Sequence, residues 1–111
     1  GFKVISGDDN LSLSMICCGG DGVISVSGQG FPKTFTKMVN SALSHSLDEA
    51  RQAHYKLLDI TNMLFEEGNP GGIKAVLMAK GICGATLRQP LWKISDNLKT
   101  RIEKEMEKES I

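Results

Sequence analysis

The segment from Phe2 to Gly28 constrains the fold most, because strand-like runs and turn residues alternate along it. Residues 4–5 belong to a short apolar run that Gly7 ends, and residues 23–26 form a second run rich in β-branched side chains. Neither run alternates cleanly between apolar and polar residues, which is typical of strands covered on both faces. The segment between them has room for one helix of about two turns. The two strands are therefore predicted to be parallel neighbours.

A glycine and two aspartates, Gly7, Asp8 and Asp9, follow the first of these runs. They stand at the predicted carboxyl end of a strand, where parallel α/β enzymes carry their functional residues. A glycine at such a place permits a tight turn in which backbone N–H groups and carboxylates approach a ligand. The same residues also suit an ordinary turn with solvated acids, so the pattern leaves both interpretations open.

Capping residues predict a helix between the two strands and another directly after them. Asn10 is predicted to cap the first of these helices, and residues 19–20, both glycine, are predicted to end it. Pro32 fits the first turn of the next helix, whose apolar residues recur at a spacing of three and four.

The second half of the sequence is predicted to be helical throughout. Ser46 and Glu49 form a capping box at the start of a long amphipathic helix. The pair at positions 69–70, Asn-Pro, offers a cap and a first-turn residue for a third helix, which Gly81 is expected to end. Ser95 is predicted to cap the last helix, whose charged face is expected to be solvated.

Charge and cysteine content exclude several functional classes. Thirteen basic and thirteen acidic residues leave no net charge at pH 7, which gives no electrostatic support for a nucleic-acid partner or an anionic membrane surface. No apolar run is long enough to span a bilayer, and no signal-like segment opens the sequence, so we expect a cytoplasmic protein. Cys17, Cys18 and Cys83 lack the spacing of a metal or redox motif. No metal or cofactor is therefore expected.

The remaining reactive or bulky side chains suit structural roles. His45 and His54 have no assignable carboxylate and nucleophile to act with, so we expect them at the surface. Trp92 and the methionines at positions 38, 63 and 78 are expected to pack between helices.

The number of predicted strands is too small for the number of predicted helices. Two parallel strands cannot form a stable sheet with both faces covered. In a chain of 111 residues, this imbalance indicates that the neighbours of the strands belong to sequence outside this chain or to another chain. We therefore expect the chain to be part of a larger fold.

Four motifs together resemble one enzyme family. They are ISGDD (residues 5–9), GGDGVISV (19–26), NPGGIK (69–74) and LRQPL (87–91). Jointly, and over essentially the whole chain, they resemble the C-terminal part of the dihydrodipicolinate synthase and N-acetylneuraminate lyase family. The resemblance implies an α/β fold in which residues 2–6 and 22–26 are the last two strands of a (β/α)8 TIM barrel. Residues 1–45 would hold the last two β/α units, and residues 46–111 would form a C-terminal helical region.

The resemblance also implies a chemistry. Members of this family are class I lyases and aldolases, in which a lysine forms a Schiff base with pyruvate and the resulting enamine attacks a small aldehyde. In the synthase members the aldehyde is aspartate semialdehyde, in the diaminopimelate route to lysine. The family lysine ends the sixth strand, which would precede Gly1, so the resemblance implies no catalytic residue in this chain. Lys74 matches a helix start in the family and is expected to be structural.

By the same resemblance, the chain alone is expected to be inactive. Its partners would be pyruvate, a small aldehyde and the N-terminal barrel portion of the same protein, in an assembly that is commonly a homo-oligomer in this family.

By this resemblance, three residues of this chain belong to the rim of a substrate pocket. Gly7 matches the family glycine that lines the pyruvate site. Ile24 matches the residue whose main-chain carbonyl and side chain face the Schiff base. Asp9 matches a position that helps bind sugar hydroxyls in the N-acetylneuraminate lyases, so it is the third substrate-binding candidate. Asp8 is expected to interact with a helix dipole, and Ser25 to fill the barrel.

Two segments depart from the family pattern and leave the substrate open. Residues 69–74 contain two glycines where the family often has N-P-I-P-x-K, and residues 27–31, SGQGF, replace the usual segment after the eighth strand. The alternatives are an N-acetylneuraminate lyase or sugar-acid aldolase of the same family, and a non-enzymatic half-barrel or helical interaction module.

Overall fold

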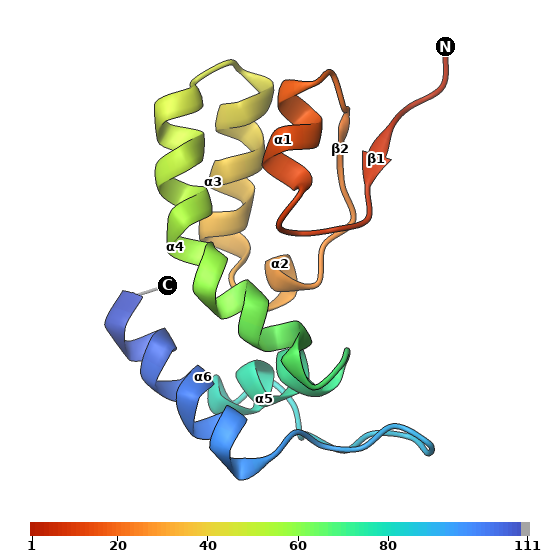
Figure 1. The fold of residues 1–111 in the computed structure, drawn as a ribbon, viewed down its shortest axis with the longest axis vertical. Coiled ribbons are helices and arrows are strands. Elements are labelled where there is room, and N and C mark those ends of the chain that lie inside the picture. The colour runs from red at the N-terminus through yellow and green to blue at the C-terminus, as the bar shows by residue number, and fades with distance from the viewer. Residues whose placement is uncertain (110–111) are drawn as a thin grey trace. The chain divides into compact units, whose positions relative to one another are not determined.

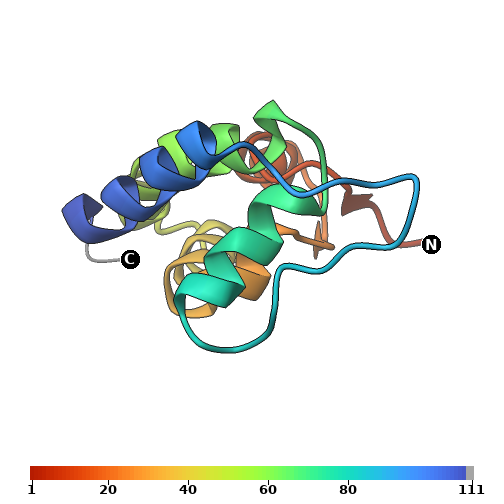
Figure 2. The ribbon, with the colours of Figure 1, turned by 90° about the horizontal axis from the view of Figure 1, so that it is seen from below.

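The computed structural model describes residues 1–109, so the last two residues of the predicted helical region lie outside it. Most of the chain is helical, as the ribbons in Figure 1 and Figure 2 show. It divides into two compact units, Gly1–Leu58 and Asp59–Ile111. The predicted division of the chain near residue 46 concerns the architecture of a complete barrel and stays a prediction.

The first unit contains two short strands, β1 (Ile5–Ser6) and β2 (Gly22–Val23). They pair in parallel, with Ile5 opposite Gly22 and Ser6 opposite Val23, which confirms the predicted orientation. One further bond, from the Ile24 N–H to the Ser6 carbonyl at 3.0 Å, extends the pairing past β2. Both strands are shorter than predicted, because within the described residues each has one neighbour and the remaining backbone at its other edge has no ladder to join.

The crossover between the strands is the helix α1 (Ser12–Cys17). The prediction that Asn10 caps it is wrong, since the N-cap position is Leu11 and no side chain caps there. Instead the Leu11 N–H donates to the Asp8 carboxylate at 3.1 Å. The side chain that closes the turn before α1 is therefore that of Asp8, two residues before the predicted Asn10.

Two helices follow β2 in the first unit. A single turn, α2 (Ser27–Gly30), was not predicted, whereas α3 (Pro32–Leu43) begins at its proline as expected. Helix α3 packs against both α1 and α2. A small apolar core joins Ile16 of α1 and Ala42 of α3 to Ala50, which lies in the helix that follows α3. Both α1 and α3 also contact β2, so this core holds the two helices against the strand pair.

The long helix α4 (Leu47–Glu66) begins directly after Ser46, where the sequence predicts its start, and residues from both units belong to it. Its predicted capping box does not form. The Ser46 N–H donates to the Ser41 carbonyl at 2.8 Å, and the Glu49 carboxylate accepts from the Ser41 hydroxyl at 3.2 Å. Glu49, in the first turn of α4, therefore ties this helix to α3 instead of bonding the backbone at its own helix start.

The second unit packs α5 (Gly71–Ala79) against α6 (Asp96–Glu109). The predicted cap of α5 is wrong, because Pro70 occupies the N-cap position without a side-chain bond. At the start of α5, a Cβ added to Gly72 would lie 2.6 Å from the Cα of Leu64. The α5 backbone therefore lies directly on the backbone of α4. Fully buried apolar side chains complete this unit: Ile60, Leu64, Val76, Leu98 and Ile102.

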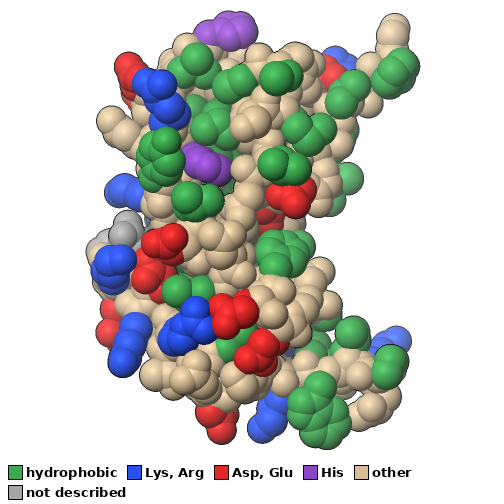
Figure 3. All heavy atoms as spheres, viewed as in Figure 1, with side chains coloured by type: hydrophobic (Ala, Val, Ile, Leu, Met, Phe, Trp, Pro, Cys, Tyr) green, Lys and Arg blue, Asp and Glu red, His purple; other side chains and the backbone are tan. Residues whose placement is uncertain are grey.

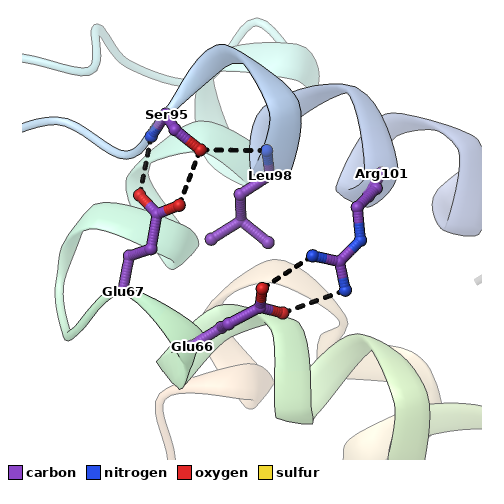
Figure 4. Close-up of polar contacts among 5 residues, drawn as sticks. All are labelled: Glu66, Glu67, Ser95, Leu98 and Arg101. Atoms are coloured by element: carbon purple, nitrogen blue, oxygen red, sulfur yellow. Dashed lines mark hydrogen bonds and ion pairs between the residues drawn. The ribbon is translucent and has the colours of Figure 1, made fainter.

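Ser95 caps α6 as predicted and also receives a carboxylate from outside the helix (Figure 4). Its hydroxyl accepts from the Leu98 N–H at 3.2 Å. The two oxygens of Glu67 accept from the Ser95 N–H at 2.7 Å and from its hydroxyl at 2.6 Å. Beside this junction, Arg101 makes a bidentate ion pair with Glu66, at 2.6 and 3.0 Å. The start of α6 is therefore fixed by exposed polar groups.

Four of the described helices are followed, two residues after their end, by a residue in the left-handed conformation. The residues are Gly19 after α1 (φ +100°), His45 after α3 (φ +63°), Gly68 after α4 (φ +96°) and Gly81 after α5 (φ +69°). After α1, α3 and α5 the next N–H reaches back to a carbonyl in the last helical turns, at 2.8–2.9 Å, as in a Schellman motif. The predicted stops at Gly19 and Gly81 are confirmed, and His45 adopts the same conformation without the freedom of glycine.

Two bulky residues differ in their environment. Met38 is buried in α3, as predicted, whereas Trp92 is 71% exposed in the loop before α6. The prediction that Trp92 packs between helices is therefore wrong for this chain. Over the described residues, no helix is long and apolar enough to cross a membrane.

Candidate functional site

The candidate site is formed by the two loops that follow β1 and β2, residues 7–10 and 24–27. Because the strands are parallel, their carboxyl ends and the loops that follow them lie at one edge of the sheet. The three predicted substrate-binding residues, Gly7, Asp9 and Ile24, belong to these loops. The structure thus brings together segments that lie about 17 residues apart in the sequence.

Gly7 and Ile24 form the open part of this site. A Cβ added to Gly7 would have no atom within 4 Å, and Ile24 is 80% exposed. Hydrophobic side chains reach the molecular surface around the N-terminal end of the chain (Figure 3), and Phe2 is 89% exposed there. Val4 and Ile5, before and in β1, are exposed as well, and several exposed apolar side chains on one pair of strands are typical of a surface that contacts another part of a protein.

Asp9 is placed differently from the other two candidates, because its side chain is 5% exposed. One oxygen, Oδ2, accepts from the Val26 N–H at 3.1 Å and from the Ser27 N–H at 2.8 Å. The other oxygen, Oδ1, is buried and has no hydrogen-bond partner. Hydrogen bonds to an ionised carboxylate are stronger than bonds between neutral groups. Asp9 therefore ties the loop after β1 to the loop after β2.

Two buried serines, Ser6 and Ser12, support the loop that carries Asp9, and the sequence analysis does not predict this role. The Ser6 hydroxyl lies 2.9 Å from the Asp8 carbonyl and 3.2 Å from the Asp8 N–H. The Ser12 hydroxyl donates to the same carbonyl at 2.7 Å. The only sequence signal for this support is a small polar residue at a strand end, followed by another at a helix start.

The two polar neighbours of the site have local structural partners. Asp8 is exposed, and its carboxylate accepts from the Leu11 N–H at the start of α1. Ser25 is half-buried, and its hydroxyl accepts from the Gly28 N–H at 2.7 Å. Each side chain therefore stabilises the turn in which it lies.

No lysine lies in the two loops of the candidate site, residues 7–10 and 24–27. Lys3 precedes β1, and its hydrogen bond with Asp21 at 2.8 Å, together with the charge of that carboxylate, raises its pKa. Lys74 is half-buried within α5, in the second unit. Partial burial lowers the pKa of Lys80, which follows α5. None of these amines follows β1 or β2, and a lysine nucleophile must reach the substrate before its pKa matters.

The histidines and cysteines form no catalytic arrangement that the structure describes. His45 is exposed, and His54 is half-buried beside the ring of Tyr55, with burial lowering its pKa. Cys17, Cys18 and Cys83 are free and exposed. Among residues 1–109, no group of three or more histidine, cysteine or acidic side chains could hold a metal ion.

Comparison with known proteins gives the same family over nearly the whole chain. The model of the dihydrodipicolinate synthetase family matches residues 1–109. The 4-hydroxy-tetrahydrodipicolinate synthase of Flavobacterium psychrophilum is 46% identical over 102 residues, which are 92% of this chain and 35% of that protein. The enzyme of the same name from Karelsulcia muelleri is 43% identical over 101 residues, 91% of this chain and 34% of that protein. The chain thus spans about a third of the length of these curated relatives.

Solved structures of related enzymes agree. The dihydrodipicolinate synthase from Aquifex aeolicus matches with a TM-score of 0.93 at 34% identity, covering 98% of this chain and 37% of that chain. A chloride-inhibited dihydrodipicolinate synthase from Acinetobacter baumannii, complexed with pyruvate, matches with a TM-score of 0.94 at 26% identity, covering 99% of this chain and 38% of that chain. These neighbours are TIM-barrel enzymes, and the two short strands and the helices of this chain match a part of them. The chain therefore belongs to the dihydrodipicolinate synthetase family of lyases.

Proposed function

We propose that this chain is the C-terminal part of a 4-hydroxy-tetrahydrodipicolinate synthase, which condenses pyruvate with aspartate semialdehyde. The observation that carries the proposal is the match of residues 1–109 to the family, with curated relatives of that name 46% and 43% identical. Because the chain spans about a third of those relatives, the activity belongs to a protein that also contains the preceding barrel. The proposed setting is the cytoplasm, and the proposed assembly is a homo-oligomer.

The exposed apolar residues of the first unit support a place for β1 and β2 within a closed barrel. Phe2, Val4 and Ile24 are 89%, 43% and 80% exposed. Strands of a TIM barrel are covered by side chains inside and helices outside, so neighbouring β/α units would remove these side chains from water. Each fully buried side chain of this size stabilises a fold by about 1.5–3 kcal/mol. Neighbouring β/α units of the barrel would therefore stabilise the strand pair by covering apolar side chains that are exposed in this chain.

The proposed roles of the chain's own residues concern shape and backbone contacts. Gly7 leaves free space beside the carboxyl end of β1, where the methyl group of pyruvate or its Schiff base would fit. Ile24 continues the strand ladder through its N–H and would present its backbone and side chain to the same pocket. Neither residue transfers a proton. The nucleophilic lysine is proposed to lie before Gly1, on the strand that precedes β1 in the barrel.

Borohydride trapping of pyruvate on the intact enzyme tests this assignment. Reduction of the Schiff base fixes pyruvate to its lysine, and peptide mapping then locates the label. We expect one labelled lysine, in the sequence before Gly1, and an undiminished yield in the variant Lys74→Gln. Label on any lysine of residues 1–111 would refute the proposed position of the nucleophile, and an enzyme that traps no pyruvate would refute the proposed activity.

The aldehyde is tested separately with the same preparation. A coupled assay offers aspartate semialdehyde and N-acetylmannosamine in turn, each with pyruvate. Turnover with aspartate semialdehyde is expected. Turnover with N-acetylmannosamine alone would assign the protein to the sugar-acid lyases of the family and contradict the proposal.

A further inference from the structure

We propose that Asp9 is a positioning residue, which holds the backbone after β2 so that Ile24 meets bound pyruvate at a fixed place. This inference rests on the proposed function, because it assigns a reason to the geometry of the same site. It differs from the expectation drawn from the sequence, in which Asp9 contacts the substrate.

The backbone around Ile24 is fixed at both ends. On the strand side, the Ile24 N–H donates to the Ser6 carbonyl at 3.0 Å. On the loop side, the Val26 and Ser27 N–H groups donate to Asp9 Oδ2 at 3.1 and 2.8 Å. One residue, Ser25, separates the two attachments. The carbonyl of residue 25 lies in the same rigid peptide plane as the Val26 N–H, so it cannot turn without breaking the bond to Asp9. The carbonyl of residue 24 belongs to the one peptide group that lies between the two attachments, so both ends of that group are held in place.

Asp9 is itself held in place, so the attachment is rigid before substrate arrives. Its side chain is 5% exposed, and the preceding residue is bonded by two buried hydroxyl groups. The Ser6 and Ser12 hydroxyls both bond the Asp8 carbonyl, at 2.9 and 2.7 Å. Such preorganisation by surrounding hydrogen bonds is what a reacting geometry requires, since small displacements of a contacting group lower the rate strongly.

The two oxygens of Asp9 have different environments, which separates positioning from substrate contact. Oδ2 receives both backbone N–H groups, whereas Oδ1 is buried without a partner. The substitution Asp9→Asn keeps one oxygen, which can occupy the place of Oδ2, and puts an NH2 group in the place of Oδ1. Asparagine thus preserves the two backbone bonds and removes the free acceptor. Asp9→Ala removes both.

Steady-state kinetics of the intact enzyme decide between these roles. We expect Asp9→Ala to lower kcat/KM for pyruvate about tenfold or more, while the KM for the aldehyde stays within about twofold. Asp9→Asn should stay within about threefold of the wild type for pyruvate. The exposed residue Asp59, on α4, provides the matched control, and Asp59→Ala should not change either value. A loss in Asp9→Asn equal to that in Asp9→Ala would assign Asp9 to substrate contact and overturn the proposal.

Amide hydrogen exchange measures the attachment without any substrate. In Asp9→Ala the amides of Val26 and Ser27 should exchange about tenfold faster or more, and in Asp9→Asn and Asp59→Ala they should exchange as in the wild type. Unchanged exchange in Asp9→Ala would overturn the proposal. If Asp9→Ala does not fold, Asp9→Asn decides by the same two measurements, with wild-type values supporting positioning. Because exchange needs no pyruvate, failure of the proposed function and failure of this inference are distinguishable.

Discussion

Each unit of the molecule contains a carboxylate that accepts two hydrogen bonds from a segment far along the sequence, and the two differ in burial. Asp9 binds the Val26 and Ser27 N–H groups and is 5% exposed. Glu67 binds the N–H and hydroxyl of Ser95 and is exposed. Water can replace the bonds of an exposed carboxylate, whereas a buried donor left without its acceptor costs about 1–3 kcal/mol. The same bonding pattern therefore stabilises a helix end in one unit and fixes the candidate site in the other.

The contrast extends to the backbone contacts of the two units. In the second unit, α5 lies on α4 so closely that Gly72 has no space for a side chain. In the first unit, Gly7 faces open space. Close packing therefore requires glycine at position 72. At position 7, only the space needed by the proposed ligand would require glycine.

The largest effect is expected from Gly72→Ala. The added Cβ would lie 2.6 Å from the Cα of Leu64, so the backbone of α5 must move, at a cost of about 3 kcal/mol. The measurement is the midpoint of urea unfolding of the intact protein. Gly84→Ala is the control, because a Cβ there meets no atom within 4 Å. Equal stability of the two variants would contradict the close contact of α5 with α4.

Gly7→Ala should show the opposite behaviour. Its stability should stay within about 0.5 kcal/mol of the wild type, since no described atom of this chain lies within 4 Å of the added methyl group and the proposed substrate pocket leaves room for it. Its kcat/KM for pyruvate should fall about tenfold, equivalent to about 1.4 kcal/mol, because the methyl group would occupy space proposed for the substrate. Unfolding and steady-state kinetics on one preparation check both halves. A stable variant with full activity would exclude Gly7 from the pocket.

A smaller loss of stability is expected from Ser95→Ala. The substitution removes the hydroxyl that caps α6 at the Leu98 N–H and leaves one of the two bonds to Glu67. Loss of an N-cap costs about 1 kcal/mol, measured by thermal unfolding. Ser95→Thr retains a hydroxyl and is the control. If both variants lose the same stability, capping is not the cause.

The smallest effect concerns the pH dependence of the second unit. The hydrogen bonds from the Ser95 hydroxyl and backbone N–H, with the charge of Arg101, lower the pKa of Glu67. A lowered pKa in the folded state means that the ionised carboxylate stabilises the fold. This contribution is fully present above the unfolded pKa, near 4.5, and is lost as the pH falls through the lower pKa of the folded state.

Comparison of unfolding midpoints between pH 6 and pH 3, roughly the range of carboxylate titration, tests this effect. The wild type should lose more stability than Glu67→Gln over that range, because glutamine does not titrate. Parallel curves for the two proteins would show that Glu67 does not contribute to the acid sensitivity.

The sequence predicts the features that depend on a few adjacent residues and a simple geometric need. Gly19 and Gly81 end their helices as predicted because the left-handed conformation at those points suits glycine. Ser95 caps α6 because its hydroxyl needs only the N–H three residues ahead. The parallel pairing of β1 and β2 followed from the length of the segment between them, which accommodates a crossover helix.

The predictions that failed depended on competition with more distant groups. Asn10 does not cap α1, because the chain turns into the helix at Leu11, after a turn that Asp8 closes through the Leu11 N–H. Glu49 does not complete a capping box, because Ser41 donates to it from α3. The buried position of Asp9 and the supporting hydroxyls of Ser6 and Ser12 were also beyond a sequence argument, since they depend on how two loops meet in space. The substrate contacts of Gly7, Ile24 and Asp9 stay predictions.

The short strand β1 has a consequence for how such a chain would behave before its barrel closes. Within the described residues it pairs on one edge, and the side chains of Phe2, Val4 and Ile5, in this strand and just before it, are exposed. An unpaired strand edge with apolar side chains is a template for pairing with other chains. During synthesis the N-terminal part of a protein emerges and folds first, so the C-terminal part proposed here would find its neighbouring strands already made. The order of synthesis would thereby protect this edge from aggregation, and production of the segment without the rest of the barrel would remove that protection.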